Sequence, residues 1–149
     1  MIASPEEFVS LRESESPSDQ TRASHDEASL EVWLGVIAAY PEMRQWVAHN
    51  KTVPVTVLQT LASDPDPAVR WVVAGKRKLD PAVLRMLADD EDDSVRARVA
   101  RHRRTEAEVL GALSHDESWV VREAAEGVLE GASSMATTTG RYACATSAS

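Results

Sequence analysis

The sequence has little of what several common protein classes need. Its 149 residues include one cysteine, Cys144, which excludes an intramolecular disulfide and a cysteine-rich zinc or iron–sulfur site. No apolar run approaches the roughly 18 residues of a membrane-spanning helix. The N-terminal segment also lacks the basic and apolar regions of a secretory signal. We therefore expect a cytoplasmic protein.

Aromatic and basic residues are also scarce. Aromatic side chains make up 5% of the chain, with a single Phe, so a core must be mainly aliphatic. Lys and Arg number 16 against 24 Asp and Glu, which gives a net charge of -8. This balance disfavours unspecific attraction to nucleic acid or to anionic lipid. The length fits a single domain of ordinary size.

The two ends of the chain differ in composition from its middle. Residues 1–25 are rich in Ser and Glu and poor in apolar residues, which predicts a disordered leader. Residues 131–149 are rich in Ser, Thr, Ala and Gly, which predicts a flexible tail. Apolar residues are dense and regularly spaced between these ends, so residues 26–130 are the predicted domain.

A 26-residue repeat dominates the predicted domain. The segments LASDPDPAVR (61–70), LADDEDDSVR (87–96) and LSHDESWVVR (113–122) align at this offset without a gap. Each unit has apolar residues at helical spacing, then a polar turn, then a second apolar stripe. Asp66 before Pro67 and Asp80 before Pro81 are typical of helix starts, and Thr105 with Glu108 fits a capping box.

Each unit is therefore predicted to be two short helices that need neighbours to bury their apolar faces. We expect an all-α fold with about eight helices: a short right-handed α-solenoid of about four two-helix repeats. The first and last copies diverge from the consensus, as terminal repeats of such arrays commonly do.

The repeat resembles the variant leucine-rich repeats of bacterial proteins, a HEAT-like α-solenoid class, over about residues 35–126. The similarity lies in the Asp-Pro turns, the Val-Arg pairs and an Asp six residues before Arg. The resemblance implies that such Asp and Arg side chains hold adjacent repeats together, and we expect Arg96 to neutralise Asp90. It also implies a recognition scaffold and no reaction.

Basic residues recur in the loops that follow the second helix of each unit, at 49–52, 75–78 and 101–104. Stacking would align these loops into one basic edge. An alternative is that the cations only complement helix C-termini.

Trp71 occupies a position in the repeat alignment at which the other units have polar or small residues. It is therefore either an exposed binding anchor or half-buried against a neighbouring repeat. The candidate binding residues are Lys51, Trp71, Lys76, Arg77, Lys78, Arg101, Arg103 and Arg104.

Catalytic and metal-binding patterns are not evident. The four histidines lack metal-ligand spacing, and Cys144 has no neighbouring base. The acidic run at 89–93 lacks the glycine of a calcium loop and fits helix capping better. We expect neither a cofactor nor a metal.

The sequence thus predicts a non-enzymatic scaffold that binds another protein, one with an acidic surface. Two alternatives stay open. One is a nucleic-acid-binding module, with an architecture similar to the HEAT-like alkylpurine DNA glycosylases. The other is a dedicated inhibitor or immunity-type protein with a single partner. No membrane association is expected.

Overall fold

The computed structural model describes residues 1–141 and the side chains of residues 1–135. Within this range the regular secondary structure is helical, apart from one parallel β-bridge between Ile2 and Ala28. The elements are α1 (Pro5–Glu13), α2 (Pro17–His25), α3 (Leu30–Ala39), the 3-10 helix η1 (Pro41–Met43), α4 (Arg44–His49), α5 (Val55–Leu61), α6 (Pro67–Ala74), α7 (Pro81–Ala88), α8 (Asp93–Ala100), α9 (Ala107–Leu113) and α10 (Trp119–Arg141). The predicted all-α class is confirmed for the described residues.

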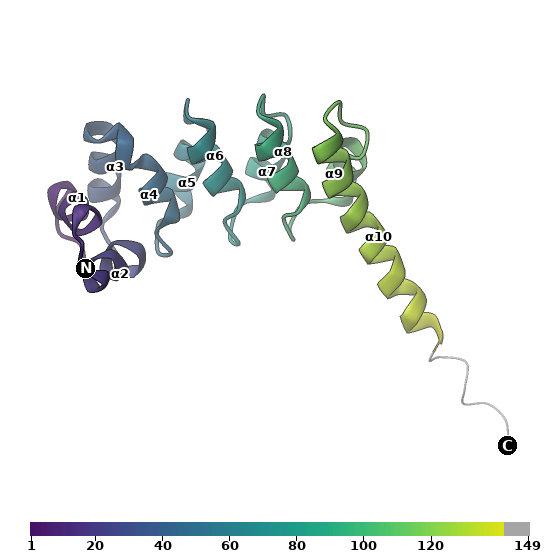
Figure 1. Cartoon of the computed structure of the whole chain (residues 1–149), viewed down its shortest axis with the longest axis horizontal. Helices are drawn as coiled ribbons and strands as arrows, with labels where there is room; N and C mark the ends of the chain where they lie inside the picture. Colours follow the sequence, from purple (N-terminus) through teal and green to yellow (C-terminus); the bar gives the residue numbers. More distant parts are fainter. Residues whose placement is uncertain (142–149) are drawn as a thin grey trace, which may run out of the picture.

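The helices from α3 onward form an elongated row of pairs (Figure 1). Along one side of the row, α4 packs against α6, α6 against α8, and α8 against α10. The intervening helices α5, α7 and α9 lie behind them. In the described residues, no helix has both the length and the apolar character needed to cross a membrane.

Helix starts follow the capping chemistry that the sequence indicates. The Asp66 carboxylate accepts the Ala68 N–H at 2.9 Å, and the Asp80 carboxylate accepts the Ala82 N–H at 2.8 Å. A proline follows each cap and occupies the first turn of the helix. Backbone N–H groups in this turn have no partner within the helix, so the missing N–H of proline costs no hydrogen bond. The capping box predicted at Thr105 is wrong. The helix begins at Ala107 with no side-chain cap, and the Thr105 hydroxyl donates instead to the Val99 carbonyl at 2.6 Å.

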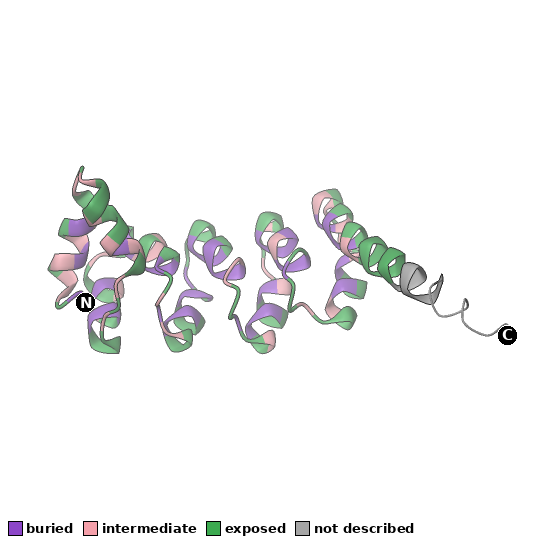
Figure 2. Ribbon diagram, turned by 90° about the horizontal axis from the view of Figure 1, so that it is seen from below, coloured by how far each residue is buried: buried purple, intermediate pink, exposed green. Residues whose placement is uncertain are grey.

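The core is aliphatic, as the scarcity of aromatic residues requires. Valines and leucines of successive helices meet between the two layers, and the buried residues follow the inner faces along the whole row (Figure 2). Small residues such as Ala48, Ala74 and Ala100 are completely buried on α4, α6 and α8. Their size lets adjacent helices approach closely, so the spacing along the row depends on them.

Arginine–aspartate pairs link successive helix pairs, but with partners other than those expected. Arg96 donates from Nε and Nη2 to the Asp116 carboxylate at 2.8 and 2.9 Å, whereas its Nη1 donates to the backbone carbonyls of Asp90 and Glu91, at 2.7 and 3.3 Å. The Asp90 carboxylate is held instead by Arg70, at 2.7 and 2.9 Å. The expectation that Arg96 neutralises Asp90 is therefore wrong. Each of these arginines reaches forward to the next turn and binds its own turn only through carbonyl oxygens.

The N-terminal segment is ordered, which corrects the predicted disordered leader at residues 1–25. Ser4 caps α1, whose Phe8 is completely buried and contacts Trp33 of α3 edge to face, with 5.4 Å between ring centroids. Arg22 of α2 bridges Glu7 at 3.1 Å and Asp26 at 3.2 Å. The few apolar residues of this segment suffice because α3 supplies their partners, so α1 and α2 cover the end of the row.

The C-terminal prediction is corrected in part. The domain was expected to end at residue 130, but α10 is one continuous helix that runs to Arg141 and projects beyond the row (Figure 1). Its first turns carry the buried residues Val121, Ala124 and Ala125, which pack against the row. The remainder of the predicted tail, with Cys144, lies outside the described residues.

Candidate functional site: a basic edge with an arginine-lined hollow

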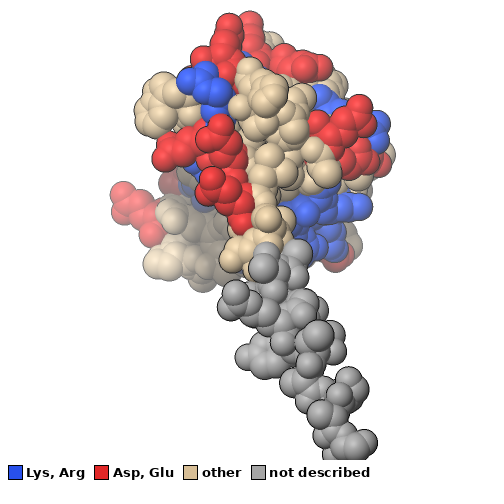
Figure 3. All heavy atoms as spheres, turned by 90° about the vertical axis from the view of Figure 1, so that its right-hand side faces the viewer, with Lys and Arg blue, Asp and Glu red and all other residues tan. Residues whose placement is uncertain are grey.

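The two edges of the row carry opposite charge. The turns that precede α6, α8 and α10 are acidic and lie along one edge, and the loops that follow α4, α6 and α8 lie along the other (Figure 1). Seen from the C-terminal end, acidic side chains cover the top of the molecule and basic side chains gather low on one side (Figure 3). We call the loops at 49–52, 75–78 and 101–104 the basic edge.

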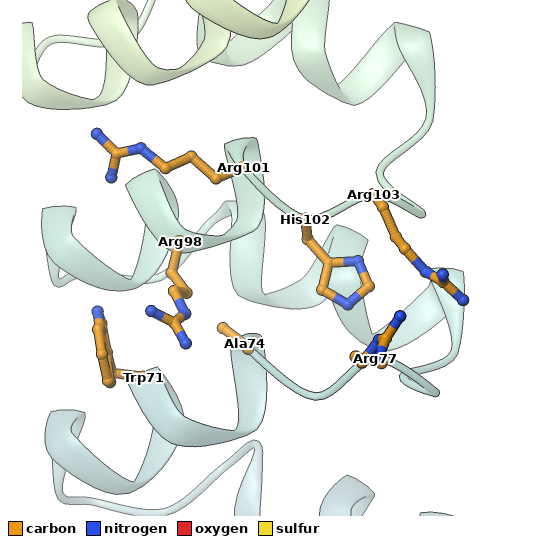
Figure 4. A pocket seen from close by; sticks show the side chains of 8 residues that line it. Trp71, Ala74, Arg77, Arg98, Arg101, His102 and Arg103 are labelled. Carbon is orange, nitrogen blue, oxygen red and sulfur yellow. The ribbon is translucent and has the colours of Figure 1, made fainter.

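A hollow of about 400 Å³ opens where the basic edge meets α6 and α8. We call it the arginine hollow. In Figure 4, the Arg98 side chain extends toward Trp71 at one end, and those of Arg77 and Arg103 approach each other at the other end, beyond His102. Its lining residues are Trp71, Ala74, Gly75, Arg77, Arg98, Arg101, His102 and Arg103.

The Arg98 side chain stacks on the Trp71 ring in a space that exists because residue 75 is a glycine. Its guanidinium carbon lies 4.0 Å from the centroid of the Trp71 ring, within the range of a cation–π contact. On its other side is Gly75, where an added Cβ would lie 2.7 Å from Arg98 Nε. Gly75 therefore provides the space that Arg98 occupies, and Trp71 keeps 37% of its surface exposed.

The arginines of the hollow lack the acidic partners that other arginines of this chain have. Arg70 and Arg96 are paired with carboxylates at 2.7 and 2.8 Å. By contrast, no carboxylate in the described part of the chain lies within 4.0 Å of a nitrogen of the four hollow arginines. Four permanently charged arginines thus line one small space, and none of them forms an ion pair with a carboxylate of the described residues. Their side chains differ in direction: in Figure 4 that of Arg101 extends away from Arg77 and Arg103.

Lys76 belongs to a different arrangement from its neighbours. Its Nζ donates to the Asn50 carbonyl at 2.8 Å, one loop earlier, and its own carbonyl contacts His102 Nε2 at 2.8 Å, one loop later. Burial, reinforced by the charge of Lys51, lowers the pKa of Lys76 from 10.5 to about 8. Lys76 therefore links neighbouring loops and does not line the hollow.

His102 forms the floor of the hollow as a neutral ring. Its Nδ1 accepts the Arg104 N–H at 3.1 Å, so the proton must be on Nε2, which donates to the Lys76 carbonyl. Both ring nitrogens are thus used in fixing the loop. The positive charge of the hollow comes from its arginines.

The other predicted binding residues lie along the basic edge but outside the hollow. Lys51 and Lys78 are exposed. Arg104 is also exposed, and its Nη1 donates to the Leu79 carbonyl at 3.0 Å. Of the eight predicted residues, the hollow brings together four: Trp71, Arg77, Arg101 and Arg103.

The sequence reasoning missed Arg98 and Arg12. Arg98 lies in a repeat column whose other members are Trp46, Val72 and Ala124, so a charged residue among apolar ones was the available signal. Arg12 stacks on Trp46, with its guanidinium carbon 3.7 Å from the ring centroid. It lies in the segment expected to be disordered, and no local pattern in that segment marks it.

His49 lies near cations from separate parts of the chain. Burial lowers the pKa of His49, and the charges of Lys76, Arg12 and Arg98 lower it further. Arg12 lies on α1, Arg98 on α8 and Lys76 in the loop after α6, so the N-terminal cap and the basic edge both contribute positive charge near this imidazole.

The chemistry that the site offers is recognition of anions. Arginine forks bind carboxylate and phosphoryl oxygens with two parallel hydrogen bonds, and Trp71 adds an apolar surface. Among the described residues, no group of three or more His, Cys, Asp or Glu is placed to hold a metal ion. No protein-family model, curated protein or solved structure matches the chain.

Proposed function

We propose that this chain is a short right-handed α-solenoid of about four two-helix repeats, of the variant leucine-rich or HEAT-like kind. Helix starts at Val55, Pro81 and Ala107 recur at the 26-residue offset of the sequence repeat. The Arg–Asp pairs and the Asn50–Lys76–His102 contacts also link residues in equivalent positions of successive units. Such nearest-neighbour links are what stabilise a repeat array.

The proposed function is that of a non-enzymatic scaffold that holds another protein through the basic edge. The observation that carries this proposal is the arginine hollow, which is lined by four arginines that form no ion pair with a carboxylate of the described residues. Unpaired positive charge on a chain with a net charge of -8 favours a partner with a local acidic surface. We keep the cytoplasm as the predicted compartment.

Nucleic acid is the second candidate partner, because the same arginines could bind backbone phosphates. The grouping of the unpaired arginines around one hollow favours a protein, because a nucleic-acid backbone needs cations that follow successive phosphates.

The test is capture from the native host by the wild-type protein and by the double variant Arg77→Glu, Arg103→Glu. Arg85→Glu serves as a control, because this exposed arginine of α7 lies outside the hollow. We expect a specific protein to bind the wild type and the control, and binding to be lost in the double variant with melting unchanged. Equal capture by all three, or capture of nucleic acid alone, would refute the proposal.

A further inference from the structure

We propose that the arginine hollow is a phosphoryl-binding site that receives a phosphorylated side chain of the partner protein. This inference rests on the proposed function and specifies the group that the hollow recognises. It is based on the number of positive groups, their confinement and the fixed position of Arg98.

The number of guanidinium groups exceeds what a single carboxylate can use. One arginine fork satisfies both oxygens of a carboxylate. A phosphoryl group presents three acceptor oxygens and carries up to two negative charges at neutral pH, so it can engage several arginines at once. Arg77 and Arg103 extend toward the same end of the hollow and form no ion pair with a carboxylate of the described residues, so a dianion bound at that end would interact with both charges (Figure 4).

The position of Arg98 makes part of the site preorganised. The Trp71 ring and the Gly75 backbone bound its guanidinium on two sides, so it has less conformational freedom to lose when an anion binds. The fixed ring of His102 forms the floor between Arg98 and the Arg77–Arg103 pair. Arginine donors therefore lie at both ends of the hollow, and the hydrogen-bonded His102 ring lies between them.

The confinement of the charge favours one phosphoryl group over a nucleic-acid backbone. Binding to a polynucleotide requires cations that follow successive phosphates along the strand. Here the unpaired arginines come from α8 and the two loops at 75–78 and 101–104, and they face a hollow of about 400 Å³. That volume is typical of a small-ligand site.

The first experiment is a nuclear magnetic resonance titration of the full chain with inorganic phosphate, with acetate and chloride at matched ionic strength. The reporters are the Gly75 amide and the Arg98 Nε–H. We expect saturable shifts with phosphate, and a dissociation constant at least about tenfold lower than for acetate, which corresponds to about 1.4 kcal/mol. Shifts of equal size with all three anions would overturn the proposal.

Two neighbouring substitutions separate the hollow from the edge as a whole. Arg77→Glu and Lys78→Glu change the charge equally in the same loop, but only Arg77 lines the hollow. Arg77→Glu should weaken phosphate binding about tenfold or more, and Lys78→Glu by less than about threefold, because screening weakens charges outside the site. Equal losses of phosphate affinity in the two variants would show that the charge of the whole basic edge attracts phosphate, which would overturn the proposal.

A final comparison uses labelled peptides and a DNA duplex. A phosphoserine peptide should bind more tightly than its unphosphorylated form and more tightly than the duplex. If an oligo-glutamate peptide binds and phosphorylation brings no gain, the phosphoryl site is wrong while the protein-binding scaffold stands. If no peptide binds, both fail, and tighter binding of the duplex would assign the site to nucleic acid.

Discussion

Replacing Arg96 by alanine removes a partly solvent-shielded charge pair between successive turns. The Arg96 and Asp116 side chains are each 10% exposed, and two hydrogen bonds of 2.8 and 2.9 Å join them. After the substitution, the Asp116 carboxylate keeps, among the described residues, only the hydrogen bond from the Ser118 N–H at 2.8 Å. Breaking a buried pair from one side costs about 3–5 kcal/mol, and the remaining solvent contact places the expected loss near the lower value.

Arg122→Ala is the matched control, because Arg122 occupies the equivalent position and, within the described part of the chain, binds only carbonyl oxygens, at 2.7 and 2.9 Å. Its loss should lower the free energy of unfolding by about 1 kcal/mol. Urea denaturation followed by circular dichroism measures both values. Equal losses for the two variants, or an unchanged midpoint for Arg96→Ala, would refute the assignment of the charge pair to stability.

The same pair predicts a pH dependence. Hydrogen bonding from Arg96 lowers the pKa of Asp116 below 3.8. A carboxylate with a depressed folded-state pKa contributes stability above its unfolded pKa and loses it as the pH falls through the folded value. The difference in the free energy of unfolding between the wild type and Arg96→Ala should therefore be largest above about pH 4 and should become smaller at lower pH.

Three further substitutions test other parts of the structure. Lys76→Met removes an amine whose pKa is lowered to about 8. The free energy of unfolding of the wild type should therefore rise relative to that of the variant between about pH 8 and 10.5, by about 1–2 kcal/mol after allowance for solvent screening. Parallel pH profiles of the two proteins would contradict this. Gly75→Ala should displace Arg98 from its stacked position and weaken phosphate binding, with a stability loss below about 1 kcal/mol; an unmoved Arg98 Nε resonance would count against it. Phe8→Ala should lower the free energy of unfolding by about 3–4 kcal/mol, because the ring is completely buried against Trp33, whereas a disordered leader would give no change.

The acidic and basic edges differ in how their charges are used. On the acidic edge, Asp64, Asp90 and Asp116 pair with arginines, and Asp66 and Asp92 cap helices. Those carboxylates are committed to the fold. On the basic edge the arginines of the hollow are not so committed among the described residues, so charge reversal there should alter binding before it alters stability.

Local chemistry explains which parts of the fold could be predicted from the sequence. Asp66–Pro67 and Asp80–Pro81 are complete helix-start signals within a few residues, and the structure has helices beginning at both prolines. The apolar spacing of Val57 and Leu61 likewise depends only on helical geometry, and both side chains are buried. Such features need no knowledge of distant contacts.

The errors arose where a distant contact determines the outcome. Phe8 orders the N-terminal segment because Trp33 lies opposite it, and composition alone does not reveal that partner. Arg96 pairs with Asp116 and not with the Asp90 carboxylate because α8 packs against α10, and Asp116 lies in the turn that precedes α10. Lys76 resembles the other basic loop residues in sequence, yet a carbonyl one loop earlier captures its amine.

The most direct test of the central claim is the anisotropy of a labelled oligo-glutamate peptide titrated with the wild type and with Arg77→Glu, Arg103→Glu. We predict saturable binding by the wild type that weakens at higher salt, and a loss of at least about tenfold in the variant with the same melting temperature. Equal affinity of the two proteins would contradict the assignment of partner binding to the arginine hollow.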